Sequence, residues 1–272
     1  MKKPDFIIAA FPRSGTSQIY NYLGQHPQVR LGKQDLWFFK DPSIFAKGFE
    51  WYQSQFENSD YIQGEATAHY FYLDCIVKIQ KFCPWAKLIF CLRYPVDRAY
   101  SHYWRRVLKA RATDPFAKLN REIIYHGEPH SEPNIIHTSL YGYWLKQILP
   151  VLSEPPLVII SENAATETPP YQQTMNKVFD YLGLSPHEII AHQDSELTHK
   201  TLKYLKYPWL HKFPMSQRIV HRIPLFWSTA EPPRNKAFEK ELTAIYRNDL
   251  SILEKLLPRH DFSIWKERYG YD

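Results

Sequence analysis

Apolar and polar positions along the chain separate short extended segments from longer segments with helical periodicity. The extended segments are Phe6–Ala10, Val29–Leu31, Tyr61–Glu65, Lys87–Leu92 and Leu157–Ile160. Short runs rich in Ile, Leu, Val and Phe are typical of strands that are buried on both faces. Between these segments, apolar residues recur at three- and four-residue intervals, which predicts helices. The predicted helices are residues 16–23, 45–56, 74–82, 139–149, 171–182 and 236–257, with a shorter one near residues 115–124. This alternation favours an α/β fold with a central, mostly parallel sheet flanked by helices.

The turn after the first predicted strand has the features of an anion site. Pro12–Gly15 breaks the apolar run and leads directly into the helix predicted from Thr16. A strand, a tight turn and a helix start bring several backbone N–H groups and the positive end of the helix dipole to one point. Further donors come from the side chains of Arg13, Ser14, Thr16 and Ser17. The sequence therefore predicts a phosphate or a close relative at this turn, although an ordinary strand–turn–helix remains the alternative.

Two well-known nucleotide motifs are absent from this turn. The chain has a single glycine here, Gly15, and no Lys-Ser/Thr pair after it, so the turn is not a Walker A loop. It also has no G-x-G-x-x-G pattern, which disfavours a dinucleotide site. A smaller or metal-free anion is therefore favoured over a magnesium nucleotide.

A second cationic turn follows the strand predicted at Lys87–Leu92. Arg93 stands at the carboxyl end of this strand, and Ser101 lies on the next helix, for which Asp97 is the predicted N-terminal cap. Parallel sheets bind ligands beyond the carboxyl ends of their strands, so Arg93 and Ser101 could converge on a second anion. Pairing of Arg93 with a local acid is the alternative.

Asp35 precedes the aromatic cluster Leu36–Phe39 and has two interpretations. It can cap or turn the chain, as aspartates often do, and the residues alone favour this structural role. Alternatively, an apolar wall beside it desolvates the carboxylate and raises its pKa towards that of a general base.

Composition narrows the possible classes of protein. The net charge of +6 suits an anionic ligand, but the sequence has no basic stripe of the kind that indicates nucleic-acid binding. Cys75, Cys83 and Cys91 lack the spacing of a metal site, and their odd number provides no disulfide framework. Together with the lack of a signal-peptide or membrane-spanning apolar stretch, they favour a reduced, cytoplasmic protein. We expect one domain over residues 1–272, in which residues 186–234 form an irregular basic flap over the ligand, with a mobile surface loop as the alternative.

The two loop motifs together carry a family resemblance. Pro12–Thr16 after one strand and Leu92–Ser101 after another resemble the sulfotransferases that depend on 3′-phosphoadenosine 5′-phosphosulfate (PAPS). Further segments are similar to the heparan-sulfate-type and bacterial branches: residues 25–29, 47–52, 64–71, 139–141 and 242–265. The resemblance implies a three-layer fold like that of the P-loop NTPases, with PAPS as the donor, adenosine 3′,5′-bisphosphate (PAP) as a product, and no metal.

The resemblance also implies roles for individual residues. The 5′-phosphosulfate would be bound by Arg13, Ser14, Gly15, Thr16, Ser17 and Gln18. Arg93 and Ser101 would hold the 3′-phosphate, and Asp35 would be the catalytic base. Arg13 would stabilise the charge on the departing phosphate, with Glu65 or His69 as alternatives to Asp35 for the base. The chain departs from the family pattern at the positions of Arg13, Trp37 and Ala66, where many members have Lys, His and Lys.

The leading hypothesis is an enzyme that transfers the sulfuryl group of PAPS to an acceptor hydroxyl, with a carbohydrate or glycan as the favoured acceptor. A lipid or polyketide-type alcohol is the rival acceptor within that class. A P-loop kinase and a non-catalytic nucleotide-binding module are the alternatives outside it. Neither the acceptor nor the oligomeric state follows from the sequence.

Overall fold

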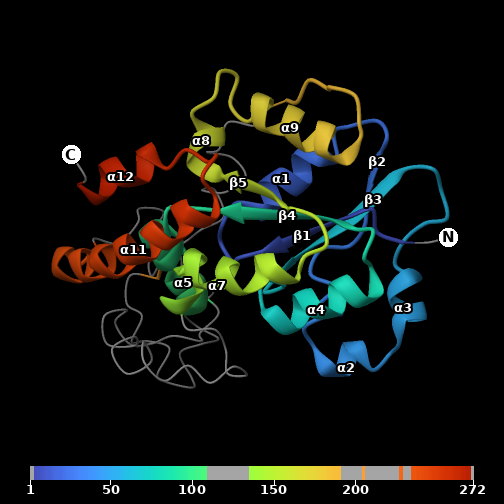
Figure 1. Cartoon of the computed structure of the whole chain (residues 1–272), viewed down its shortest axis with the longest axis horizontal. Helices are drawn as coiled ribbons and strands as arrows, with labels where there is room; N and C mark the ends of the chain where they lie inside the picture. Colours follow the sequence, from blue (N-terminus) through green and yellow to red (C-terminus); the bar gives the residue numbers. More distant parts are fainter. Residues whose placement is uncertain (1–2, 109–134, 191–203, 206–226, 229–233, 271–272) are drawn as a thin grey trace. The chain divides into compact units, whose positions relative to one another are not determined.

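The computed structural model describes residues 3–108, 135–190, 204–205, 227–228 and 234–270 (Figure 1). The chain divides into two compact units. The first unit comprises Met1–Tyr94, Tyr141–Ala191 and Asn248–Asp272, and the second comprises Pro95–Leu140 and His192–Arg247. The single domain expected over residues 1–272 stays a prediction.

The first unit contains a five-stranded sheet in the order β2-β3-β1-β4-β5. Its strands are β1 (Phe6–Ala10), β2 (Val29–Leu31), β3 (Ile62–Ala68), β4 (Lys87–Leu92) and β5 (Leu157–Ile160). All four strand pairs are parallel, so the carboxyl ends of the strands lie at one edge of the sheet. The predicted α/β fold with a parallel central sheet is confirmed.

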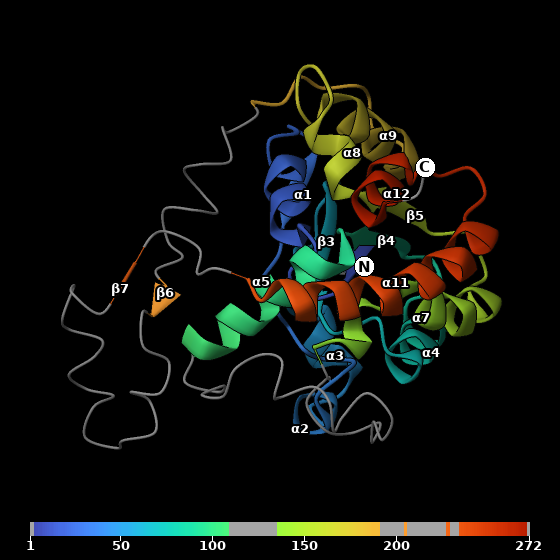
Figure 2. The same ribbon diagram turned by 90° about the vertical axis from the view of Figure 1, so that its left-hand side faces the viewer.

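Helices cover both faces of this sheet. Those of the first unit are α1 (Thr16–Leu23), α2 (Pro42–Phe45), α3 (Phe49–Gln53), α4 (Leu73–Phe82), α7 (Tyr141–Ile148), α8 (Ser161–Ala165), α9 (Gln172–Leu182) and α12 (Ser263–Tyr269). Figures 1 and 2 place α1 and α9 on one side of the sheet and α4 and α7 on the other. The apolar faces of α1 and α9 pack on β1, β3, β4 and β5 in one buried core, which explains the apolar character of these strands.

Local residues explain where the helices begin and end. The single helix predicted over residues 45–56 is wrong, because Gly48 has a φ of 85° and separates α2 from α3. Asp41 begins α2 by accepting hydrogen bonds from the N–H groups of Ser43 (2.8 Å) and Ile44 (3.2 Å). Gly183, with a φ of 75°, ends α9 as predicted.

The second unit contains α5 (Pro95–Leu108), the 3₁₀ turn η1 (His137–Ser139), and the antiparallel pair β6 (Tyr204–Leu205) and β7 (Trp227–Ser228). It also contains the first part of α11 (Lys236–Leu256), which continues into the first unit. Most of the flap predicted over residues 186–234, and the short helix expected near residues 115–124, lie outside the described residues.

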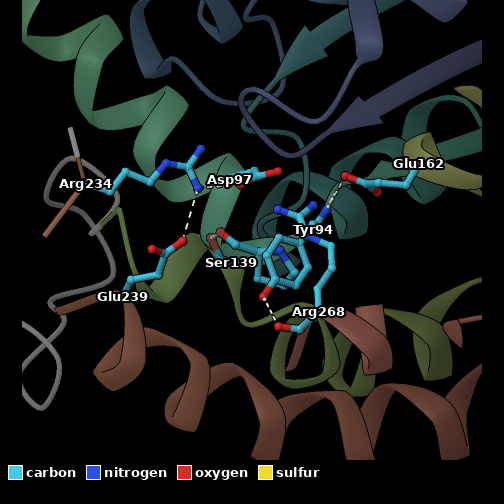
Figure 3. A network of polar contacts seen from close by, with 8 residues as sticks. Tyr94, Asp97, Ser139, Glu162, Arg234, Glu239 and Arg268 are labelled. Carbon is cyan, nitrogen blue, oxygen red and sulfur yellow. Dashed lines mark hydrogen bonds and ion pairs between the residues drawn. The ribbon is translucent and has the colours of Figure 1, made fainter. Parts of the chain in front are cut away.

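Polar contacts stabilise the second unit. Asp97 is not the N-terminal cap of α5, because the helix begins two residues earlier and places Asp97 in its first turn. The side chain of Asp97 instead pairs with Arg234 at 2.7 Å, and Arg234 also reaches Glu239 at 3.3 Å (Figure 3). The completely buried Arg98 donates to Ser139 Oγ at 2.5 Å and to the carbonyl of Ile135.

The tight packing of β3 on β1 yields a stability prediction. A Cβ atom on Gly64 would overlap the carbonyl oxygen and the ring of Phe6 on the paired strand, so we expect Gly64→Ala to lower the free energy of unfolding by roughly 2–3 kcal/mol. Gly183→Ala meets no neighbour within 4 Å and incurs only left-handed backbone strain of about 1 kcal/mol. Urea unfolding of both variants measures the difference. Wild-type stability in Gly64→Ala would contradict the packing argument.

Candidate anion site at the carboxyl edge of the sheet

The loop between β1 and α1, residues 12–17, forms an anion cradle from backbone geometry. Arg13 and Gly15 both have left-handed backbone, with φ values of 71° and 88°. Gly15 occupies the N-cap position of α1, and no side chain caps this helix end. The first N–H groups of a helix have no intrahelical acceptor, so those of α1 can donate to a bound anion, together with the positive end of the helix dipole.

The position of Gly15 requires glycine for two reasons. Its φ is unfavourable for other residues, and an added Cβ atom would lie 2.7 Å from Ser161 Oγ. The hydroxyl of Ser161, the first residue of α8 directly after β5, donates to the carbonyl of Ser14 at 2.8 Å. The loop is therefore held by the segment that follows a strand two positions away in the sheet.

The structure places the predicted donor-binding residues of this loop in different environments. Ser14 is completely buried, and its hydroxyl lies 3.3 Å from the hydroxyl of Tyr141. Arg13 is half-buried and Ser17 is exposed, so these two side chains are accessible at the surface, whereas the hydroxyl of the half-buried Thr16 is itself buried. The side-chain amide of Gln18 donates to the Tyr22 hydroxyl at 3.1 Å. The role of each residue in donor binding stays a prediction.

The turn after β4, residues 93–94, is fixed through its backbone. The Tyr141 hydroxyl donates to the carbonyl of Arg93 at 2.9 Å, and the N–H of Tyr94 donates to Glu162 Oε1 at 2.8 Å (Figure 3). The other carboxylate oxygen of Glu162 accepts from the indole N–H of Trp265 at 3.0 Å. The backbone carrying Arg93 is thus held in place, while the Arg93 side chain remains half-buried.

The C-terminal helix α12 also packs on this turn. The Arg268 guanidinium lies 3.7 Å from the ring centroid of Tyr94, a cation–π contact, and its carbonyl accepts from the Tyr94 hydroxyl at 3.5 Å. Arg93 and Ser101 belong to different compact units, and their predicted convergence on one phosphate stays a prediction.

Unusual backbone conformations mark the ends of β2 and β3. Asp35, Trp37 and His69 have φ values of 55°, 58° and 79°. Such conformations cost about 1–3 kcal/mol each and cluster at functional sites. The side chains of Trp37 and His69 are both half-buried, and their ring centroids lie 5.1 Å apart. These residues make the same edge of the sheet a candidate acceptor site.

Burial separates the two candidate carboxylates. Asp35 is exposed, so the prediction that an apolar wall desolvates it is wrong. Its backbone N–H donates to the Ala66 carbonyl at 2.9 Å, and its Oδ1 accepts from the N–H of Ala68 at 3.4 Å. Its role as the base stays a prediction.

Glu65 is the buried carboxylate of β3. It is completely buried, and this desolvation raises its pKa from 4.5 to about 7. Thr67 and Tyr52 each donate to it at 2.6 Å, which partly opposes the shift. The geometry assigns Glu65 to the interior of the sheet and Asp35 to the surface.

Three residues that support the site were not predicted as site residues from the sequence: Tyr141, Ser161 and Glu162. In the sequence, residues 139–141 stand out only through the family resemblance, and Ser161 and Glu162 have no local signal beyond following an apolar strand. Each contacts loops far away in the sequence, so no local pattern reveals its partner. Ala66, which stands where a lysine was expected, is nearly buried in the apolar core.

Within the described ranges, no group of three or more His, Cys, Asp or Glu residues could hold a metal ion. The same part of the chain contains no helix that is both long and apolar enough to cross a membrane. The expected independence from metal and the cytoplasmic location stay predictions.

A helix N-terminus without a side-chain cap after the central strand of a parallel sheet, beside a turn that carries Arg93 on the neighbouring strand, is an arrangement typical of α/β proteins that bind phosphate groups. Residues 3–222 match the family described as Sulfotransferase domain, and the chain belongs to that family.

Two known sulfotransferases are similar in sequence to parts of this chain. The membrane-associated sulfotransferase kil1 of Dictyostelium discoideum is 32% identical over 151 residues, which cover 52% of this chain and 30% of kil1. Heparan sulfate glucosamine 3-O-sulfotransferase 5 of Mus musculus is 28% identical over 191 residues, which cover 67% of this chain and 54% of that protein. The chain thus spans about a third to a half of these relatives.

A solved structure resembles the whole fold. The crystal structure of a sulfotransferase from Alicyclobacillus acidocaldarius matches with a TM-score of 0.69 and 23% identity. The match covers 98% of this chain and 100% of that chain. The shared fold is therefore that of a sulfotransferase, in agreement with the fold expected from the resemblance.

The raised pKa of Glu65 predicts a pH dependence of stability. Because the folded state holds this proton up to a pH of about 7 and the unfolded state only to about 4.5, the free energy of unfolding should fall as the pH rises between these values. The difference between the two pKa values corresponds to about 3 kcal/mol in the free energy of unfolding. Glu65→Gln should remove this component, and urea unfolding at pH 5 and pH 7.5 measures it. If the free energy of unfolding of Glu65→Gln changes between pH 5 and pH 7.5 as much as that of the wild type, Glu65 is not the source of the pH dependence.

Proposed function

We propose that the chain transfers the sulfuryl group of PAPS to a hydroxyl group of a carbohydrate or glycan acceptor. The observation that carries this proposal is the anchored pair of turns after β1 and β4, which offer an open helix N-terminus and two half-buried arginines at one edge of the sheet. Membership of the sulfotransferase family supports the same reaction.

Donor binding follows from the chemistry of these two turns. The N–H groups at the start of α1 and the Arg13 guanidinium would bind the 5′-phosphosulfate, and Arg93 would bind the 3′-phosphate. Arginine stays protonated in proteins, so Arg13 would act as a fixed charge and not as a proton donor. PAPS when bound supplies the activated sulfuryl group.

The reaction we propose is an in-line displacement. The acceptor hydroxyl loses its proton to the base while its oxygen forms a bond to sulfur, and the bond between sulfur and the bridging oxygen of the 5′-phosphate breaks. The electron pair of that bond goes to the phosphate, where Arg13 and the N–H groups of α1 stabilise the developing charge. The products are the sulfate ester and PAP.

Asp35 is the base that the geometry favours. A general base must reach the proton that it abstracts, and this condition precedes the matching of its pKa. The pKa of Glu65, about 7, would suit the task, but its carboxylate is completely buried and both its oxygens already accept hydrogen bonds. Asp35 is exposed at the same edge of the sheet, and His69 is the alternative beside it.

The half-buried rings of Trp37 and His69 support a sugar acceptor. An aromatic face beside an exposed carboxylate suits a ligand that combines apolar C–H faces with hydroxyl groups. The similarity to a relative named for a heparan sulfate glucosamine activity points in the same direction. A lipid or polyketide-type alcohol remains the alternative acceptor.

The donor site can be tested by calorimetric titration with PAP, without metal, and separately with magnesium-ATP. We expect PAP to bind, and we expect Arg93→Ala to weaken PAP about 10- to 100-fold because a charge-assisted contact to the 3′-phosphate is lost. Lys78→Ala, which removes a cation on α4 that pairs with Asp74, is the control. A preference of the wild type for magnesium-ATP over PAP would instead support a kinase.

The catalytic base can be tested with labelled PAPS and a panel of monosaccharides, glycan fragments and long-chain alcohols. Asp35→Asn should lower kcat by roughly 10²–10⁴-fold and leave the Kd of PAP unchanged, since the base acts on the acceptor. Glu65→Gln should retain turnover within a few-fold. Full activity in Asp35→Asn together with loss in His69→Gln would transfer the role to His69. If the wild type sulfates none of the acceptors on the panel, a non-catalytic nucleotide-binding module would be favoured.

A further inference from the structure

Tyr141 joins the two predicted anion-binding turns through one atom. Its hydroxyl donates to the carbonyl of Arg93 at 2.9 Å, accepts from the N–H of Arg93 at 3.3 Å, and lies 3.3 Å from Ser14 Oγ. A tyrosine hydroxyl has one proton and two lone pairs. Since its proton is directed at the Arg93 carbonyl, Ser14 is the donor in the third contact. Every hydrogen-bonding position of this hydroxyl is therefore used on the two turns.

The ring of Tyr141 is held in a single position. The residue is completely buried, and its ring meets the edge of Phe11, directly after β1, at a centroid distance of 4.8 Å. On α12, the ring of Trp265 lies 5.9 Å away. A buried ring between two aromatic neighbours has few alternative rotamers, so its hydroxyl keeps a fixed location.

The backbone of Tyr141 is fixed as well, at the first turn of α7. The two carboxylate oxygens of Asp249 accept from the N–H groups of Gly142 and Tyr143, each at 2.8 Å. Gly142 permits this close approach, because a Cβ atom there would lie 2.5 Å from the carbonyl oxygen of Asp249. A carboxylate from a distant part of the chain thus caps α7 and sets the position from which Tyr141 extends.

We infer that Tyr141 is a positioning residue that sets the separation between the two halves of the donor site. This inference rests on the proposed function, since it assigns the 5′-group to the loop of residues 12–17 and the 3′-phosphate to the turn of residues 93–94. A ligand that carries both anions gains from simultaneous binding only if the two turns are spaced to match it. Tyr141 provides that match and itself touches no ligand.

The binding of three adenosine phosphates distinguishes whether Tyr141 sets the spacing of the two turns or only stabilises the fold. The ligands are adenosine 3′,5′-bisphosphate, adenosine 5′-monophosphate and adenosine 3′-monophosphate, titrated into the full chain by calorimetry. In Tyr141→Phe the bisphosphate should bind about 10-fold more weakly, because the two turns lose their common anchor. Each monophosphate uses one turn and should weaken by no more than about threefold.

Tyr20→Phe is the matched control. Tyr20 is a buried tyrosine whose single hydroxyl proton is shared between the carbonyls of Gly32 (2.9 Å) and Gly64 (3.3 Å), and Gly64 pairs with the first residue of β1, away from the carboxyl edge. This variant loses the same group and a comparable number of hydrogen bonds. It should lower Tm as Tyr141→Phe does, while the ratio of bisphosphate to monophosphate affinity stays at the wild-type value.

Ser14→Ala keeps the inference testable if Tyr141→Phe does not fold. The Ser14 side chain is completely buried against Tyr141, so its removal breaks the link from the other side. Because the Ser14 hydroxyl donates to Tyr141 and not to a ligand in this arrangement, its removal should weaken the bisphosphate more than either monophosphate, and combining it with Tyr141→Phe should add little. Equal weakening of all three ligands in these variants, or wild-type affinity for the bisphosphate, overturns the inference. Failure of the wild type itself to bind the bisphosphate overturns the proposed function, and the inference with it.

Discussion

The parallel pairing of β1 with β3 on one side and with β4 on the other is the constraint on which the candidate site depends. Parallel strands end at the same edge, so the segments that follow β1, β3 and β4 meet there although they are separated by tens of residues in the chain. The close fit of Gly64 against Phe6 shows how little room this pairing leaves. Each turn at the edge is then held by a residue from another element, which is what converts neighbouring loops into a site with defined geometry.

The two carboxylates near this edge illustrate how burial divides chemical roles. Glu65 lies within β3 and Asp35 follows the neighbouring strand β2, yet Glu65 is completely buried and Asp35 is exposed. Burial raises the pKa of Glu65 to about 7, a value that resembles that of a catalytic base, while the hydrogen bonds from Tyr52 and Thr67 occupy its oxygens. The perturbed pKa therefore belongs to the carboxyl group that is enclosed in the sheet, whereas Asp35 is the more accessible of the two.

The departures from the family pattern have physical explanations in the fold. Ala66 belongs to the apolar core that α1 and α9 build against the sheet, where the charge of a lysine would lose its hydration. The carbonyl of Ala66 still anchors the N–H of Asp35 at 2.9 Å, and this contact does not depend on the side chain. Trp37 places an aromatic ring beside that of His69, so the proposed acceptor site offers a surface on which an acceptor can stack.

The sequence by itself determined the five strands of the parallel sheet, most of its helices and the loop after β1, because these features depend on local periodicity and on residues with strong conformational preferences. Gly183 ends α9 and the run Phe6–Ala10 forms a buried strand for reasons that are visible within a few residues. Gly48 divides residues 45–56 through a left-handed φ, which helical periodicity alone did not reveal. Only the tertiary structure decided the exposure of Asp35 and the burial of Glu65. It alone also directed Tyr141, Ser161 and Glu162 onto the site. Burial and long-range hydrogen bonds are properties of residues brought together by the fold, and no stretch of sequence contains both partners.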